Sequence, residues 1–550
     1  MKDYKHKSKI NSTMRKLIVL FACIIYFSIA NANPEERDTC IKILKNENWW
    51  GSSVIFGTEM PFGQKEFSFN LSDHTGNQNS PILISNKGRW VWSEKPFAYS
   101  FNHDSLCITN IVGNIQMGAA GNDLKSAYEY CSENFFPTSG KWVDSLLITA
   151  PQYNLWIELM YNPTQKAVLA YANNVLKNEL PPGVLMIDDN WSKYYGEFDF
   201  DKEKFPDAKN MIARLHENGF KVMVWICPFI SPDSKEFRTL ADKRYLLLDR
   251  GQNDTATWGN HELEPLIINW WNGYSACLDL TNPGAVKWLK NKLNFLQTTY
   301  GIDGFKFDAG DATYYSSPDL VSYKEESAKE QCRRWAEIGL GYKLNEYRAM
   351  WKMGGQPLVE RLRDKDHTWE ALQSLIPNTI AQQLDGYTFT CPDMIGGGSF
   401  TSFLPGKIIN QDLIVRSAQC HALMPMMQFS VAPWRILDSV HLNAVKKTVT
   451  IRQEHISYIM QVIAHSVQTG EPVLRPLEYN FPNQNLAQIK DQFMIGDKLM
   501  VAPVVTEGFE RKVVLPKGKW RYKNKTITGG KIMQFKVPLD ELLFFELIEH

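Results

Sequence analysis

Between residues 161 and 465, short apolar runs alternate with longer segments whose apolar residues recur at intervals of three and four. The short runs predict strands, which lie at residues 184–187, 221–224, 305–307, 387–391 and 426–429. The longer segments predict amphipathic helices, which lie at residues 163–176, 205–219 and 283–300. Strands and helices that alternate over roughly 300 residues indicate an α/β fold with a parallel sheet, and the number of units favours a (β/α)8 TIM barrel.

An open, doubly wound sheet is the alternative α/β fold. Its nucleotide-binding forms carry a G-x-G-x-x-G or Walker loop early in the chain. Gly396-Gly397-Gly398 follows an aspartate and fits neither pattern. The barrel is therefore the preferred prediction.

The segments on either side of this region have a different pattern. In residues 33–160, short β-rich pieces at 80–84, 89–92 and 97–101 are separated by Gly, Asn and Ser turns, which predicts an antiparallel β-sandwich domain. Short strands and tight turns return in residues 466–550 and predict a second β-sandwich domain. The expected chain thus holds a barrel at 161–465 between two β domains.

Residues 1–32 have the composition of a targeting segment. Several lysines precede an apolar run from Leu17 to Ala30, which ends in Ala30-Asn31-Ala32. This order resembles a secretory signal peptide. The run is shorter than the roughly 20 residues that cross a bilayer. We therefore expect a protein of the secretory pathway, secreted or periplasmic; the alternative is membrane attachment through an uncleaved N-terminal segment.

Charge and composition narrow the choice of partner. The 60 Lys and Arg residues balance 60 Asp and Glu residues, so nothing favours nucleic acid or an anionic membrane surface. The aromatic content of 12% includes 17 tryptophans, whose faces suit sugar rings as well as protein cores. No cysteine or histidine spacing predicts a metal site, and no cofactor is expected. Some cysteines could pair in an oxidising compartment, and Cys40, Cys107 and Cys131 lie close enough in the sequence to share one domain, but the sequence does not define which of them pair.

Functional side chains stand at the ends of the predicted barrel strands. They are Asp188, Trp225, Asp308, Asp393 and Ser430. Each alone fits a turn or a helix cap, but strand ends converge on one mouth of a barrel, where such enzymes keep their chemistry. Convergent carboxylates are what glycoside hydrolysis requires, and proton-transfer isomerases also use them.

The stretch around Asp308 resembles the nucleophile motif of glycoside hydrolase family 31, through Phe305-Lys306-Phe307-Asp308. Asp364 stands five residues before a tryptophan, which is similar to the family's acid/base motif, and Asp366 is a competing candidate for the acid. Arg348, sixteen residues before Asp364, stands where the family has a sugar-binding arginine.

Other motifs of the family follow in order. Leu185 to Trp191 looks like its substrate-binding aspartate segment, and Asp393 opens a segment similar to its D-x-x-G motif. The resemblance covers roughly residues 80 to 540. Two segments, Lys306 to Asp311 and Gln428 to Trp434, are most similar to the branch of the family that contains the myogenesis-regulating glycosidase.

The resemblance implies a retaining, exo-acting α-glycosidase that hydrolyses terminal non-reducing α-linked sugars through a covalent glycosyl-enzyme. Asp308 would be its nucleophile and Asp364 its acid/base. The residues that would bind the small carbohydrate substrate are Asp188, Asp189, Trp225, Lys306, Arg348, Asp393 and Ser430.

Three positions depart from the family's pattern. Asp311 replaces a glutamate that many family α-glucosidases carry three residues after the nucleophile. Ser430 lies near the position of a histidine, and Arg363 replaces a glycine before the acid. The sugar is therefore expected to be an α-galactoside or an α-glucoside. The competing hypotheses are a catalytically silent sugar-binding or regulatory protein on the same fold, and an α-transglycosylase.

Overall fold

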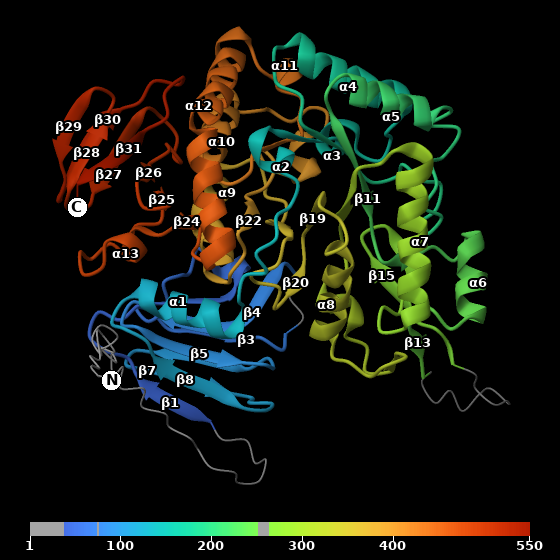
Figure 1. Ribbon diagram of the computed structural model, residues 1–550, viewed down its shortest axis with the longest axis horizontal. Helices are drawn as coiled ribbons and strands as arrows, with labels where there is room; N and C mark the ends of the chain where they lie inside the picture. Colours follow the sequence, from blue (N-terminus) through green and yellow to red (C-terminus); the bar gives the residue numbers. More distant parts are fainter. Residues whose placement is uncertain (1–37, 74–75, 251–262, 550) are drawn as a thin grey trace, which may run out of the picture.

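The protein consists of a central barrel with one β domain below it and another beside it (Figure 1). The computed structural model describes residues 38–73, 76–250 and 263–549. The expected signal segment, residues 1–32, lies outside the described residues. No helix in the described part of the chain is long and apolar enough to cross a membrane.

Eight parallel strands form the barrel sheet, in the order β22-β21-β19-β17-β11-β10-β9-β23. In chain order they are β9 (Gln152–Asn154), β10 (Val184–Ile187), β11 (Lys221–Ile226), β17 (Gly304–Phe307), β19 (Asn345–Tyr347), β21 (Val359–Arg361), β22 (Phe389–Cys391) and β23 (Gln428–Phe429). A parallel bridge from Met394 to Gln428 joins the two ends of the sheet. The predicted (β/α)8 barrel is confirmed.

Helices cover the outside of this sheet. They are α4 (Gln165–Lys177), α5 (Ala208–Glu217), α7 (Pro283–Tyr300), α8 (Ala328–Gly339), α9 (Trp369–Leu384), α10 (Gln411–Ala422) and α12 (Ser439–Thr469). The first three were predicted. For α7, the side chain of Asn282 caps the helix, proline occupies its first turn, and Gly301 ends it in a left-handed conformation.

The barrel begins earlier in the chain than the sequence pattern indicates. Strand β9 lies before residue 161 but pairs with both β10 and β23. Its sequence, Gln-Tyr-Asn, has no apolar run to mark it as a barrel strand. At the other end, α12 continues past residue 465. The barrel sheet thus includes a strand before residue 161, and helix α12 ends after residue 465.

A long insertion separates β11 from α7 on the described chain. It contains β12 (Phe229–Ile230), α6 (Lys235–Asp242), β13 (Leu248–Asp249), β14 (Glu264–Pro265), β15 (Ile267–Trp270) and β16 (Gly273–Cys277). Strands β15 and β16 form an antiparallel hairpin, and β12 pairs with β16.

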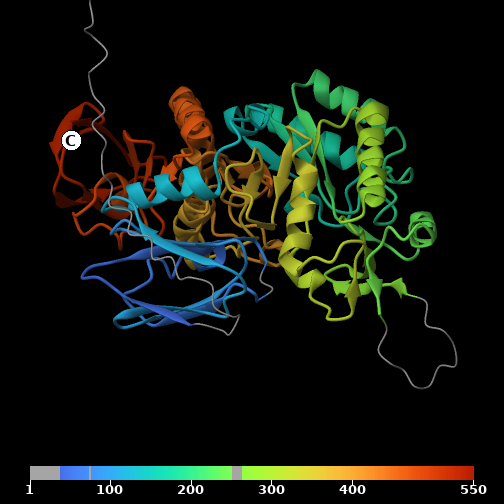
Figure 2. The same ribbon diagram turned by 60° about the horizontal axis from the view of Figure 1, so that its bottom comes forward.

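The N-terminal domain contains two antiparallel sheets. One has β1 (Thr39–Lys42), β7 (Ser105–Thr109), β6 (Ala98–Asn102) and β3 (Phe67–Asn70); the other has β2 (Trp49–Ser53), β4 (Gln78–Ser85), β5 (Arg89–Ser93) and β8 (Ile115–Ala119). A disulfide joins Cys40 to Cys107, whereas Cys131 is free and buried. Helix α1 (Leu124–Phe135) lies across the second sheet (Figure 2).

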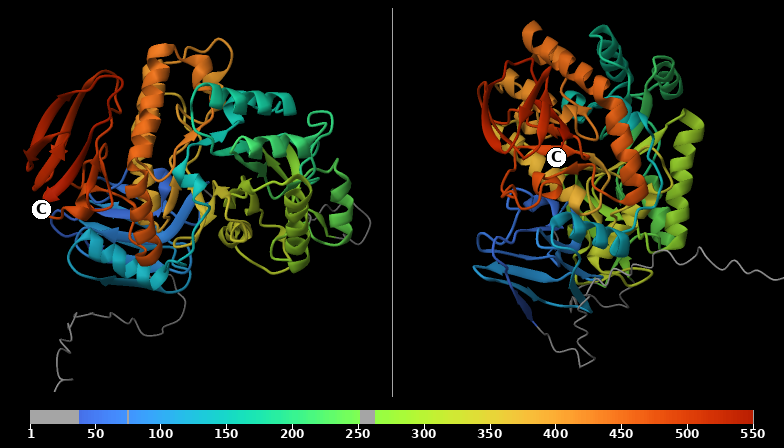
Figure 3. Two further views of the ribbon diagram at one scale, coloured as in Figure 1. Left: turned by 45° about the horizontal axis from the view of Figure 1, so that its top comes forward. Right: turned by 60° about the vertical axis from the view of Figure 1, so that its left-hand side comes forward.

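The C-terminal domain is also a β domain. Its main sheet has β24 (Leu474–Arg475), β25 (Phe493–Ile495), β26 (Leu499–Val501), β31 (Phe544–Glu549), β28 (Lys519–Tyr522) and β29 (Lys525–Thr528), and a separate pair has β27 (Glu510–Leu515) and β30 (Lys531–Lys536). Figure 3 shows helix α12 between these strands and the barrel. The two predicted β domains are confirmed.

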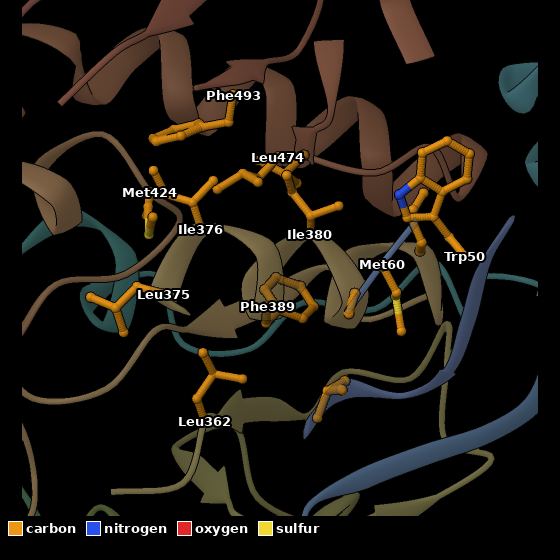
Figure 4. Close-up of a cluster of buried hydrophobic side chains, with 14 of the residues drawn as sticks. Trp50, Met60, Leu362, Leu375, Ile376, Ile380, Phe389, Met424, Leu474 and Phe493 are labelled. Carbon is orange, nitrogen blue, oxygen red and sulfur yellow. The ribbon is translucent and has the colours of Figure 1, made fainter. Parts of the chain in front are cut away.

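One hydrophobic core joins all three domains (Figure 4). Trp50 of the N-terminal domain and Phe493 of the C-terminal domain pack in the same cluster as Ile376 and Ile380 of α9. Burial of each large apolar side chain stabilises the fold by roughly 1.5 to 3 kcal/mol. Helix α9 directly follows the loop that carries Asp364, so both β domains hold that loop in place through the helix.

Two acids are buried where the N-terminal domain meets the barrel. Glu360 and Asp385 have almost no solvent exposure. Burial raises the pKa of Glu360 well above its ordinary value, and the nearby Asp385 adds to this shift. A carboxyl with a raised pKa stabilises the fold at low pH, and this contribution is lost as the pH rises from its unfolded pKa towards its folded pKa.

Glu360→Gln should therefore stabilise the protein, and more so at pH 8 than at pH 4.5. The amide stays neutral, and each pH unit that separates the folded from the unfolded pKa corresponds to about 1.4 kcal/mol. Thermal unfolding at both pH values measures the effect. The exposed Glu203→Gln is the control. A gain that is the same at both pH values would contradict the prediction.

Candidate active site

Four aspartates lie at the carboxyl ends of the barrel strands. Asp188 follows β10, Asp308 follows β17, Asp364 follows β21 and Asp393 follows β22. This is the end of a parallel barrel at which loops form active sites. The structure therefore brings together the carboxylates that the sequence singles out.

Asp308 is buried in a setting that favours its charged form. Its Oδ2 accepts a hydrogen bond of 2.8 Å from the indole N–H of Trp225, and its Oδ1 lies 3.4 Å from Nε of Arg348. Burial opposes ionisation, but Arg348, Lys306 and Arg361 outweigh it and lower the pKa of Asp308 well below its ordinary value. Asp308 is an anion at neutral pH.

The turn after Asp308 contains two residues in the left-handed backbone conformation. Ala309 and Gly310 both have positive φ angles, of 54° and 70°. A Cβ on Gly310 would overlap the indole of Trp335. Glycine is required here for both conformation and space, and the turn fixes the direction in which the Asp308 side chain leaves β17.

Lys306 and Asp188 form an ion pair inside the barrel. The Lys306 ammonium donates a hydrogen bond of 2.7 Å to Asp188, and both side chains are at most 5% exposed. Burial disfavours the ammonium, but Asp188 outweighs burial and raises the pKa of Lys306. The pair stays charged because each member compensates the other.

Arg361 is the cation at the centre of the remaining acids, and sequence reasoning missed it. Its Nη1 donates to Asp364 at 2.6 Å and to Asp393 at 3.3 Å, and its Nε lies 3.3 Å from a Glu346 oxygen. Burial raises the pKa of Asp393 to about 7, although Arg361 opposes the shift. The Asp364 side chain is 39% exposed, which leaves it open to an incoming molecule. Its competitor Asp366 forms no ion pair with a cation of the described chain.

Arg348 contacts both Asp308 and Asp311, the position that departs from the family's pattern. Besides Asp308, its guanidinium contacts Asp311 and lies 4.8 Å from the ring centre of Trp271. Asn77 of the N-terminal domain donates its backbone N–H to Asp311 at 3.3 Å. The side chain of Asn77 also accepts a hydrogen bond from the backbone of Arg363. The N-terminal domain thus touches two sides of the site.

The other predicted site residues have defined places. Trp225 lies within β11 rather than after it, and it holds Asp308 through its N–H. Ser430 follows β23 and is fully buried, and its hydroxyl accepts a hydrogen bond from the backbone N–H of Ile157. Asp189 accepts hydrogen bonds from Tyr195 and Asn272. No group of acids, histidines and cysteines in the described chain has the arrangement of a metal site.

An ionised carboxylate and a second, more exposed carboxylate at the mouth of one barrel are the groups that cleavage of a glycosidic bond requires. Comparison with known families gives matches to two parts of the chain. Residues 150–354 match the TIM-barrel domain of glycosyl hydrolases family 31, and residues 470–545 match the C-terminal domain of that family. The chain belongs to glycoside hydrolase family 31.

Individual relatives support this membership. The chain is 32% identical over 440 residues to the myogenesis-regulating glycosidase of Mus musculus, an alignment that covers 77% of this chain and 60% of that protein. It is 26% identical over 528 residues to an alpha-xylosidase of Lactiplantibacillus pentosus, covering 89% and 64%. The chain thus spans less than two thirds of the length of these relatives.

Solved structures show the same fold. A family 31 dextranase of Flavobacterium johnsoniae, complexed with glucose, superposes with a TM-score of 0.79 at 17% identity. The match covers 94% of this chain and 67% of the dextranase. The fold of the whole described chain is therefore that of the family.

Arg361→Met should destabilise the protein by roughly 3 to 5 kcal/mol, because it leaves buried acids without their cation. Chemical unfolding measures the loss. Arg363→Met, two residues away and exposed, is the matched control and should change stability by less than about 0.5 kcal/mol. Equal effects of the two substitutions would show that the charge at position 361 does not stabilise the site.

Proposed function

We propose that this protein is a retaining, exo-acting α-glycosidase that removes terminal non-reducing sugars. The charge state of the Asp308 carboxylate is the main support for this function. Asp308 is held as an anion by Arg348, Lys306 and Trp225 at the mouth of the barrel, where a nucleophile must stand.

In the first step, Asp308 attacks the anomeric carbon of the bound sugar. A carbon–oxygen ester bond forms as the bond to the leaving oxygen breaks, and Asp364 gives its proton to that oxygen. In the second step Asp364 takes a proton from water, whose oxygen attacks the same carbon and releases Asp308. A retaining mechanism requires the two carboxyl groups to stand about 5 to 5.5 Å apart when substrate is bound.

The neighbouring residues would hold the sugar. Asp188 and Asp393 each have carboxylate oxygens at the mouth that can accept hydrogen bonds from sugar hydroxyls, in addition to their bonds to Lys306 and Arg361. The ring of Trp271 is 43% exposed above Arg348, and its face suits the apolar face of a sugar. Contact of Trp225 and Ser430 with the sugar stays a prediction.

The sugar itself is proposed to be an α-galactoside or an α-glucoside. Asp311, which stands where many family α-glucosidases have a glutamate, pairs with Arg348, and Arg348 also contacts Asp308. A relative is an alpha-xylosidase, so α-xylosides belong in the same panel of substrates.

We also propose that the protein acts in the secretory pathway or outside the cell. The disulfide between Cys40 and Cys107 supports this, because such bonds persist in oxidising compartments.

Substitution of each carboxylate tests the roles. On a panel of aryl α-galactosides, α-glucosides and α-xylosides, Asp308→Ala should lose at least about 10³-fold in kcat/KM, because the nucleophile is gone. Azide should then occupy the vacated space and give a glycosyl azide of inverted configuration. Asp364→Ala should keep activity on substrates with good leaving groups, and azide should give a product of retained configuration.

Asp366→Ala is the matched control and should retain activity. If it instead behaves as described for Asp364→Ala, the acid is Asp366. A wild-type protein that cleaves no sugar of the panel but binds one would favour the non-catalytic alternative. Products larger than the substrate would identify a transglycosylase.

A further inference from the structure

Three polar side chains that hydrogen-bond to one another lie beside the site, and the backbone N–H of Asn190 also donates to Asp189 at 2.6 Å. Asp189 follows Asp188 at the end of β10 and is buried. Its Oδ1 accepts a hydrogen bond of 3.0 Å from the Tyr195 hydroxyl, and its Oδ2 accepts one of 2.6 Å from the Asn272 amide. The Asn272 amide also donates to the Tyr195 hydroxyl at 2.8 Å. Both Asp189 oxygens are therefore engaged by the protein itself.

The partner Asn272 stands in the turn of the β15–β16 hairpin, immediately after Trp271. Trp271 lies against the guanidinium of Arg348, which in turn contacts Asp308. The hairpin belongs to the long insertion, and Asp189 is 83 residues away from Asn272 in the chain. The hydrogen bonds of Asp189 thus connect the end of a barrel strand to the loop that carries the exposed indole.

We propose that Asp189 is a positioning residue that acts through Asn272 and Tyr195 to hold Trp271 over Arg348, and so determines how tightly the sugar binds. The inference rests on the proposed glycosidase function and replaces the direct sugar contact expected for Asp189. Asp189 acts on Trp271 and not on Asp308 or Asp364. Loss of the Asp189 carboxylate therefore raises KM more than it lowers kcat.

Buried hydrogen bonds to a charged acceptor are strong, so the bonds from Asn272 and Tyr195 to Asp189 stabilise the position of the hairpin. A carboxylate accepts bonds on both oxygens, whereas an amide at the same place turns a donor towards the Asn272 amide and leaves polar groups unpaired. The geometry also fits the reverse arrangement, with the amide at position 189 and the carboxylate at position 272. The double exchange should therefore restore the hydrogen bonds that each single substitution breaks. A substitution that acts only by its bulk or by destabilising the fold would not be rescued in this way.

The environment of Asp189 gives a second readout. Burial and the adjacent Asp188 raise the pKa of Asp189 to about 7. The other titratable or charged groups near it are Tyr195, Tyr161, Cys227 and Lys204. As the pH falls below about 7, Asp189 gains a proton and one of its oxygens stops being a full acceptor. KM should therefore rise more steeply below pH 7 in the wild type than in Asp189→Asn, in which Asp393, whose pKa is also about 7, still titrates.

The test compares Asp189→Asn, Asn272→Asp and the double exchange on the panel substrate that the wild type cleaves best. Each single variant should raise KM at least tenfold with less than a threefold change in kcat, and the double exchange should recover most of the loss. Asn269→Asp, exposed on the same hairpin, is the matched control with the same charge change. Thermal unfolding of all four variants establishes that they are folded.

Recovery in the double exchange supports the inference. A double exchange no better than the single variants, or an Asn272→Asp protein with wild-type KM, overturns it. If the wild type turns over no substrate, the glycosidase proposal fails, and dissociation constants for the panel sugars, measured by calorimetry, make the same comparison. A wild type that neither cleaves nor binds these sugars contradicts both proposals.

Discussion

The acids and cations inside the barrel mouth keep one another charged. A buried carboxylate stays ionised only where cations and hydrogen-bond donors repay the loss of water. Here Lys306, Arg348 and Arg361 do so from the neighbouring strands β17, β19 and β21 or the residues just after them. Because each cation contacts at least one acid, a change at one position alters the charge balance of its neighbours. The same arrangement keeps Asp308 an anion and leaves Asp364 open to solvent.

The two β domains hold this arrangement in place. Helix α9, which begins just after the loop of Asp364, is packed between them in a shared core. Strand β20 (Met350–Trp351), just after Arg348, pairs with β4 of the N-terminal domain, and Asn77 precedes that strand. Separation of the N-terminal domain would therefore disturb both Arg348 and the acid loop. The site therefore depends on contacts of the N-terminal domain as well as on the barrel.

Apolar runs in the sequence predict the parts of this site that follow ordinary strands, whereas Arg348 and Asp364, which follow β19 and β21, were predicted only from the resemblance to the family. Asp188, Asp308 and Asp393 stand after strands that an apolar run marks. Strands β9, β19 and β21 were missed, because their side chains include Gln, Asn, Glu and Arg, which face a polar, charge-paired interior instead of an apolar core. Arg361 was missed with its strand. The contact of Asp189 with Asn272 could not be predicted from the sequence either, because it depends on how a long insertion folds back over the barrel.

The stereochemistry of the first product distinguishes a retaining from an inverting reaction. Proton NMR during hydrolysis of an aryl α-glycoside follows which anomer of the free sugar appears before mutarotation mixes the two. If Asp308 attacks the anomeric carbon as an anion and water then displaces it, as proposed, the α-anomer forms first. Initial formation of the β-anomer would contradict this proposal, since that result requires direct attack by water and no glycosyl-enzyme on Asp308.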